Sequence, residues 1–81
     1  MTYSEKFSGA SVLIVEDEFL LAEETRRKLE TLGATVIGPT PQVDEALDYL
    51  DTTRVDAAIL DIYLAGELVF PVAERLQDMG I

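Results

Sequence analysis

The stretch VLIVED, residues 12–17, decides the fold, because four consecutive apolar residues lead directly into two acids. The stretch AAILD, residues 57–61, repeats this pattern later in the chain. A short apolar run bounded by polar residues is typical of a buried strand in a parallel sheet. Ligands of open α/β sheets bind outside the carboxyl ends of the strands, so we expect the acids to converge on a hard-cation site.

The segments around these two stretches alternate between strand and helix patterns. Thr40 followed by Pro41 is a plausible N-cap and first position of the second helix. The residues expected to share an inward face are Leu21, Thr25, Leu29 and Leu32 in the first helix, Val43, Ala46, Leu47 and Leu50 in the second, and Val69, Val72, Ala73, Leu76 and Met79 in the third. We expect strands at residues 11–15, 34–37 and 55–60, and helices at about 18–32, 41–50 and 68–79. Residues 62–67 are expected to form a loop. This βαβαβα order predicts an α/β fold with parallel strands and right-handed crossovers.

Composition narrows the classes of partner and site. The chain has 81 residues and a formal net charge of -10, from 16 acidic and 6 basic side chains. Such acidity argues against nucleic acid or an anionic membrane as a direct partner. The chain contains no cysteine and no histidine, which leaves carboxylates as the candidate metal ligands. No membrane-spanning stretch or signal peptide is evident, so we expect a cytoplasmic protein.

The acids at the strand ends have a functional and a purely structural interpretation. Glu16, Asp17 and Glu18 could simply cap the first helix, and Asp61 could cap a turn. However, if the first and third strands are neighbours, the two acidic ends meet. Two unit charges about 4 Å apart repel by roughly 4 kcal/mol at an effective dielectric near 20. A cation would relieve this repulsion, and carboxylate oxygens without histidine or cysteine suit Mg²⁺.

At these positions the chain resembles the receiver domains of bacterial two-component response regulators. VLIVEDE, residues 12–18, is similar to their first strand and acidic pair, and AILD, residues 58–61, to their phosphoacceptor strand. The resemblance implies part of a flavodoxin-like fold, with three parallel strands in the order 2-1-3 and three helices. It also implies that Asp61 is the phosphoacceptor and a Mg²⁺ ligand, and that Asp17 is a direct ligand. Glu16 would act through a metal-bound water, and Tyr63 would offer its backbone carbonyl.

The same resemblance implies a role in signalling rather than catalysis. The partner that this resemblance implies for the chain is a sensor histidine kinase or a phosphotransfer protein, which would donate the phosphoryl group to Asp61. The ring of Tyr63 is best interpreted as a surface or half-buried loop aromatic. Glu67 could approach the site or begin the third helix, and the helix start is the favoured interpretation.

The chain also departs from the receiver pattern. Ala65, followed by Gly66-Glu67, stands where many receivers have proline. The hydroxyl residue after the fourth receiver strand and the lysine after the fifth have no counterpart, because the chain stops after three βα units. The only lysines, Lys6 and Lys28, do not match the family position. We therefore expect residues 1–10 to form a flexible tail and residues 11–81 to form a receiver truncated after its third βα unit. Its third strand would be an open sheet edge, which favours a homo-oligomer joined through that edge.

Two other functions fit parts of the sequence. An aspartate-nucleophile phosphatase of the haloacid-dehalogenase type also uses an acid after a buried strand, but it places a second acid two residues later. In this chain that position is Tyr63. A pure interaction module, with acids that serve only as solvated caps, predicts that divalent cations leave the stability unchanged.

Overall fold

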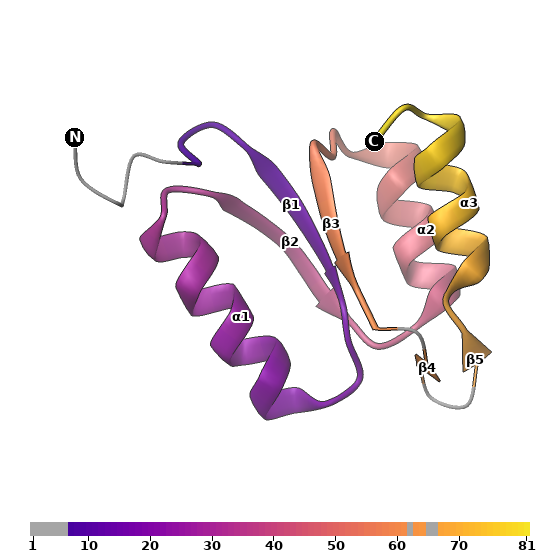
Figure 1. Cartoon of the computed structure of the whole chain (residues 1–81), viewed down its shortest axis with the longest axis horizontal. Helices are drawn as coiled ribbons and strands as arrows, with labels where there is room; N and C mark the ends of the chain where they lie inside the picture. Colours follow the sequence, from indigo (N-terminus) through magenta and orange to yellow (C-terminus); the bar gives the residue numbers. More distant parts are fainter. Residues whose placement is uncertain (1–6, 62, 65–66) are drawn as a thin grey trace.

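The computed structural model describes residues 7–61, 63–64 and 67–81. Three parallel strands, β1 (Ser11–Val15), β2 (Thr35–Thr40) and β3 (Ala57–Leu60), form one sheet in the order β2-β1-β3 (Figure 1). The central strand β1 has neighbours on both sides, which explains why its apolar run is almost completely buried. The predicted α/β fold with strand order 2-1-3 is confirmed.

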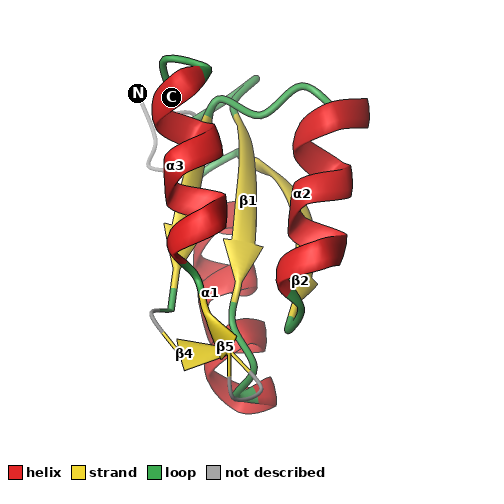
Figure 2. Ribbon diagram, turned by 90° about the vertical axis from the view of Figure 1, so that its right-hand side faces the viewer, coloured by secondary structure: helices red, strands yellow, loops and turns green. Residues whose placement is uncertain are grey.

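Helices cover both faces of this sheet. Figure 2 shows α1 (Phe19–Thr31) behind the sheet, and α2 (Val43–Thr52) and α3 (Phe70–Asp78) in front of it. A hydrophobic core cluster lies between the sheet and the helices α2 and α3. Its buried residues are Leu13, Val15, Ile37, Val43, Ala46, Leu50, Val55, Val69, Val72 and Leu76.

The structure corrects part of the prediction of which helix residues face inward. Val72 and Leu76 are buried as expected, and so is Val69, the N-cap residue of α3. Leu21 and Met79, however, are 48% and 46% exposed, so these two expectations are wrong. Ala22 is the buried residue of α1. The face of this helix that contacts the sheet is therefore rotated slightly from the face that carries Leu21.

The end of β2 differs from the prediction. The strand continues through Gly38 and Pro39 to Thr40, and α2 begins only at Val43, with Gln42 as its N-cap. Thr40 is therefore not the helix cap. Its side-chain Oγ1 instead accepts a hydrogen bond from the Gln42 N–H at 3.2 Å. Pairing with β1, which continues to Thr40, keeps this segment extended.

A second, two-stranded sheet follows β3. The short strands β4 (Tyr63–Leu64) and β5 (Glu67–Leu68) pair antiparallel, with Tyr63 opposite Leu68. The expectation of a loop over residues 62–67 is wrong at these positions, because a hairpin ladder organises the backbone. Residues 62, 65 and 66 lie outside the described residues, and with them the departures from the receiver pattern at Ala65 and Gly66.

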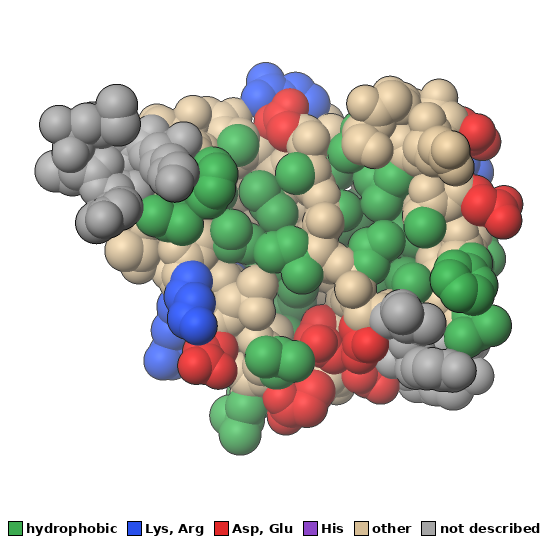
Figure 3. Space-filling view, viewed as in Figure 1, with side chains coloured by type: hydrophobic (Ala, Val, Ile, Leu, Met, Phe, Trp, Pro, Cys, Tyr) green, Lys and Arg blue, Asp and Glu red, His purple; other side chains and the backbone are tan. Residues whose placement is uncertain are grey.

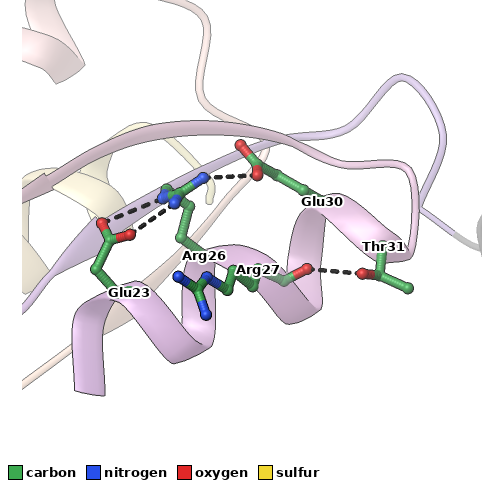
Figure 4. A network of polar contacts seen from close by, with 5 residues as sticks. All are labelled: Glu23, Arg26, Arg27, Glu30 and Thr31. Carbon is green, nitrogen blue, oxygen red and sulfur yellow. Dashed lines mark hydrogen bonds and ion pairs between the residues drawn. The ribbon is translucent and has the colours of Figure 1, made fainter. Parts of the chain in front are cut away.

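An ion-pair network links three residues of α1. Arg26 lies between Glu23 and Glu30, and its guanidinium nitrogens are 2.6 and 2.7 Å from their carboxylate oxygens (Figure 4). This hydrogen-bonded guanidinium lowers the pKa of Glu23. Both ion pairs of Arg26 are thus made within α1.

Hydrogen bonds tie the start of the described chain to the end of α1 and to β2. The Phe7 N–H donates to the Leu32 carbonyl, and the Thr35 N–H donates to the Ala10 carbonyl, both at 2.8 Å. The expected flexible tail stays a prediction for residues 1–6, which lie outside the described residues. Within the described ranges, every helix is too short or too polar to cross a bilayer.

Candidate metal and phosphoacceptor site

Three acids meet at the carboxyl edge of the sheet. Val15 lies opposite Leu60 in the parallel pairing of β1 with β3, so the residues that follow them emerge side by side. Glu16, Asp17 and Asp61 each offer a carboxylate oxygen, and these oxygens all lie within 4.8 Å of one another. Figure 3 shows acidic side chains gathered along this edge. The expected convergence of the two acidic strand ends is confirmed.

Main-chain hydrogen bonds fix the backbone beneath the cluster. The Asp61 N–H donates to the Val15 carbonyl, and the Glu16 N–H donates to the Thr40 carbonyl, both at 2.9 Å. Glu16 and Asp61 are therefore held by the sheet itself, whereas Asp17 lies in the exposed turn before α1. Rigid strand ends position functional side chains better than a free loop would.

Thr40 is the positioning residue that the sequence did not reveal. It is completely buried, and its carbonyl holds the backbone of Glu16. The sequence pattern predicts a helix cap at this position, because threonine before proline is a common cap signal. No signal in this single sequence distinguishes the two roles, since the contact depends on how β2 pairs with β1.

Part of the cluster also organises the start of α1. Glu18 is the N-cap, and its carboxylate accepts hydrogen bonds from the Leu20 N–H at 3.3 Å and the Leu21 N–H at 2.6 Å. The Glu16 Oε2 accepts from the N–H groups of Asp17 and Glu18, at 3.0 and 3.1 Å. The structural interpretation is therefore correct for Glu18. Glu16 combines a turn-stabilising role with membership of the cluster.

The electrostatics of Glu16 reflect this crowding. Loss of hydration raises the pKa of Glu16, and a hydrogen bond and Coulomb repulsion from the Asp61 carboxyl raise it further. The N–H groups of Glu18 and Asp17 act in the opposite direction. The net increase shows that the environment disfavours a full negative charge on Glu16, as expected where acids crowd together. A bound cation would reverse this preference.

The donor set fits a hard divalent cation. It consists of carboxylate oxygens from two half-buried acids, Glu16 and Asp61, and one exposed acid, Asp17. Mg²⁺ binds through few protein carboxylates and keeps several waters, so an open cluster at a sheet edge suits it. The Tyr63 carbonyl stays a predicted ligand. The side chains of Tyr63 and Glu67 lie outside the described residues.

Lys28 lies far from the acidic site. It therefore does not take the place of the lysine that follows the fifth strand in receiver domains. Lys28 lies in the last turn of α1, ten residues after the Glu18 cap. At 1.5 Å per residue this places it roughly 15 Å along the helix from the acidic end. The expectation that Lys28 does not match the family position therefore agrees with its place in the fold.

Known proteins with similar sequences are bacterial signalling regulators. The chain is 38% identical over 69 residues to the sensory transduction protein LytT of Bacillus cereus, covering 84% of this chain and 28% of that protein. LytT of Bacillus subtilis is 35% identical over 69 residues, which is 84% of this chain and 29% of that protein. The transcriptional regulatory protein YvrH of Bacillus subtilis is 29% identical over 70 residues, with coverages of 86% and 30%. The chain thus spans less than a third of the length of these relatives.

Neither a family model nor a solved structure matches the chain. The assignment therefore rests on the agreement of three observations: the similarity to LytT and YvrH, the parallel sheet of order 2-1-3, and the acids that the sheet brings together. These three observations agree with the resemblance of the chain to a fragment of a response-regulator receiver domain.

Proposed function

We propose that the chain is a phosphoacceptor module of a two-component phosphorelay, and that residues 11–81 are the N-terminal part of a receiver domain. The observation that carries the proposal is the convergence of Glu16, Asp17 and Asp61 within 4.8 Å at the carboxyl edge of β1 and β3. The related regulators supply the signalling context. We infer a signalling domain rather than an enzyme, located in the cytoplasm.

Asp61 is the proposed nucleophile. One of its carboxylate oxygens would attack the phosphorus of the donor, forming an acyl phosphate as the bond to the donor's leaving group breaks. The leaving group would depart with the electron pair of that bond and take up a proton from solvent. The hydrogen bond from the Asp61 N–H to the Val15 carbonyl holds the backbone of Asp61 in place, and this helps to position the attacking oxygen.

All three acids would take part in holding the cation. Asp17 and Asp61 are the proposed direct ligands, Glu16 would act through a bound water, and the Tyr63 carbonyl would complete the protein ligands. When bound, Mg²⁺ would neutralise the negative charge that accumulates on the phosphoryl oxygens. The raised pKa of Glu16 supports the proposal, because it indicates a cluster that repels additional negative charge.

The proposed phosphodonor is a phosphohistidine on a sensor kinase or a phosphotransfer protein. The 81 residues contain no histidine that could serve as the donor, so the proposal assigns the donor to a partner. The acidic net charge gives no support to direct binding of nucleic acid or an anionic membrane. No observation favours the dehalogenase-type phosphatase.

The intact mass of the chain tests this function. The protein is incubated with Mg²⁺ and phosphoramidate, a small phosphodonor, and compared with the variants Asp61→Asn and Asp17→Asn. We expect a single phosphoryl adduct on part of the unmodified chain, dependent on Mg²⁺. The labelled fraction should be small, because the family's lysine and hydroxyl have no counterpart.

The controls separate the roles of the two acids. Asp61→Asn should remove the adduct at any Mg²⁺ concentration, whereas Asp17→Asn should reduce it and shift its Mg²⁺ dependence upwards. An adduct of equal size on Asp61→Asn would contradict the proposal. So would the absence of any adduct on a chain whose circular dichroism shows that it is folded.

A further inference from the structure

The pairing of β1 with β2 becomes irregular directly before the acidic cluster. Leu13 of β1 lies opposite Ile37 of β2. Two residues later in β1, Val15 lies opposite Thr40, which is three residues later in β2 (Figure 1). The strand β2 therefore contains one extra residue, which is the definition of a β-bulge. Because a bulge changes which residue comes next in register, this one brings Thr40 to the end of β1.

Gly38 allows the bulge to form against β1. Its φ is 89°, a backbone conformation that residues with a side chain rarely adopt. A Cβ at this position would lie 2.9 Å from the Thr40 nitrogen and 3.0 Å from the Ile14 oxygen. One of these atoms belongs to each strand, so a larger residue would push β2 away from β1 at the bulge.

Thr40 makes two hydrogen bonds at the end of the bulge. Its carbonyl accepts the Glu16 N–H at 2.9 Å, and its Oγ1 accepts the Gln42 N–H at 3.2 Å. The second bond closes a tight turn that includes the peptide group of the Thr40 carbonyl. The buried hydroxyl therefore restrains the direction of the carbonyl that holds Glu16.

Glu16 passes this restraint on to the turn before α1. Its Oε2 accepts the Asp17 N–H at 3.0 Å and the Glu18 N–H at 3.1 Å. A displacement of Glu16 would thus also displace the backbone of Asp17. The backbone of Asp61, in contrast, is held by the Val15 carbonyl through the pairing of β1 with β3. Two acids of the cluster are therefore connected to the bulge, and the third is held from the other side of β1.

We propose that the bulge in β2 sets the Mg²⁺ affinity of the acidic cluster, with Gly38 and Thr40 as positioning residues that act through Glu16 and Asp17. Neither residue touches the cation or the phosphoryl group. The proposal rests on the proposed phosphoacceptor function, because that function brings Mg²⁺ to these acids.

Four variants of the 81-residue chain test the proposal. Gly38→Ala introduces the clash between β1 and β2, and Gly80→Ala makes the same change at a positive-φ glycine after the C-cap of α3. Thr40→Val removes the hydroxyl acceptor but keeps the branched shape of the side chain. Thr40→Ser keeps the acceptor and should rescue the effect. The two Thr40 variants decide the question by themselves if Gly38→Ala does not fold.

Amide hydrogen exchange in EDTA measures the positioning without metal. The exchange rate of the Glu16 N–H is divided by that of the Asp61 N–H, because a general loss of stability raises both rates. We expect Gly38→Ala and Thr40→Val to raise this ratio by about threefold or more, since they open the β1–β2 end locally. Gly80→Ala and Thr40→Ser should keep the ratio of the natural chain. An unchanged ratio in both Gly38→Ala and Thr40→Val would overturn the proposal.

Titration with MgCl₂, followed by the amide NMR signals, measures the effect on the site in chains whose spectra show that they are folded. We expect the Mg²⁺ dissociation constant to rise about tenfold in Gly38→Ala, because residues that orient metal ligands typically contribute about tenfold or more to affinity. The increase in Thr40→Val should be smaller. Gly80→Ala and Thr40→Ser should bind Mg²⁺ as the natural chain does.

The titration separates failure of this proposal from failure of the phosphoacceptor function. If the natural chain, Gly38→Ala and Thr40→Val bind Mg²⁺ equally well, the role of the bulge is overturned and the function is not. If the natural chain itself binds no Mg²⁺, both are overturned.

Discussion

Glu16 serves two structural purposes that conflict electrostatically. Its carboxylate accepts two N–H hydrogen bonds in the turn before α1, and this favours the charged form. It also lies beside Asp61 with reduced hydration, and this favours the protonated form. The second influence is larger, so the pKa of Glu16 rises on folding. The acid that helps to form the turn thereby also contributes to the repulsion that a cation would relieve.

This pKa increase predicts a pH dependence of stability. The folded chain holds the Glu16 proton more tightly than the unfolded chain, so the stabilisation is present below the unfolded value of about 4.5 and is lost as the pH rises through the folded value. Glu16→Gln imitates the protonated form at every pH. In EDTA, urea unfolding should show the natural chain losing stability relative to Glu16→Gln as the pH rises. A constant difference between the two proteins would contradict the prediction.

The Glu18 cap predicts a separate effect. Glu18→Ala removes the acceptor for the Leu20 and Leu21 N–H groups, and this should lower the free energy of unfolding by about 0.5–1 kcal/mol. Urea unfolding is best measured in about 1 M NaCl, where a screening length of about 3 Å suppresses the general effect of removing a negative charge. Glu24→Ala, an exposed change in the same helix, should have little effect. Equal losses in both variants would show that the cap contributes nothing.

At the scale of the elements, the end of β2 connects the fold to the site. Gly38 has a φ of 89°, and a Cβ at this position would lie 2.9 Å from the Thr40 nitrogen and 3.0 Å from the Ile14 oxygen. Backbone atoms cannot move aside as a flexible side chain can. Glycine at this position therefore allows β2 to pass close to β1 and to present the Thr40 carbonyl to Glu16.

Gly38→Ala should consequently destabilise the chain by about 2–4 kcal/mol, because it combines an unfavourable φ with a steric clash. Gly80→Ala is the matched control. Gly80 also has a positive φ, 78°, but no atom lies within 4 Å of its Cβ position, so its loss should be only about 1–2 kcal/mol. Thermal or urea unfolding compares the two variants. If Gly38→Ala cost no more than Gly80→Ala, the close approach of the strands would be unimportant.

For the whole molecule, net charge and small size act together. A chain of 81 residues has a limited core, and a formal charge of -10 adds repulsion among its surface acids. Ion pairs offset part of this repulsion: Arg26 pairs with two acids of its own helix, Arg54 with Asp56, and Arg75 with Asp51. The acids at the carboxyl edge of the sheet are where a divalent cation would contribute most.

Mg²⁺ should therefore stabilise the chain more than NaCl of equal ionic strength. A cation present at about 100 times its dissociation constant adds about 2.7 kcal/mol to the free energy of unfolding. Asp17→Asn should remove this excess while preserving the smaller response to NaCl. Thermal unfolding in the two salts provides the measurement. Equal responses to both salts in the natural chain would favour the interpretation that the acids are only caps.

The sequence by itself determined the alternation of strands and helices and the residues of the acidic cluster. Apolar runs such as residues 12–15 are local patterns, and parallel strands bring their carboxyl ends to one edge whatever the details of packing. The same logic predicted the burial of Val72 and Leu76. Burial within a helix depends on periodicity within one element, and the acidic cluster depends only on two strands running parallel side by side.

Only the tertiary structure decided the features that depend on contacts between elements. Pairing with β1 keeps Thr40 in a strand, although its local sequence favours a helix cap. The hairpin ladder organises residues 63–64 and 67–68, and packing on the sheet buries Ala22 while leaving Leu21 and Met79 exposed. The raised pKa of Glu16 likewise requires Asp61 beside it. Apart from the short hairpin, the partner in each case is distant in sequence, so its hydrogen bonds, shape or charge are not encoded in the local pattern.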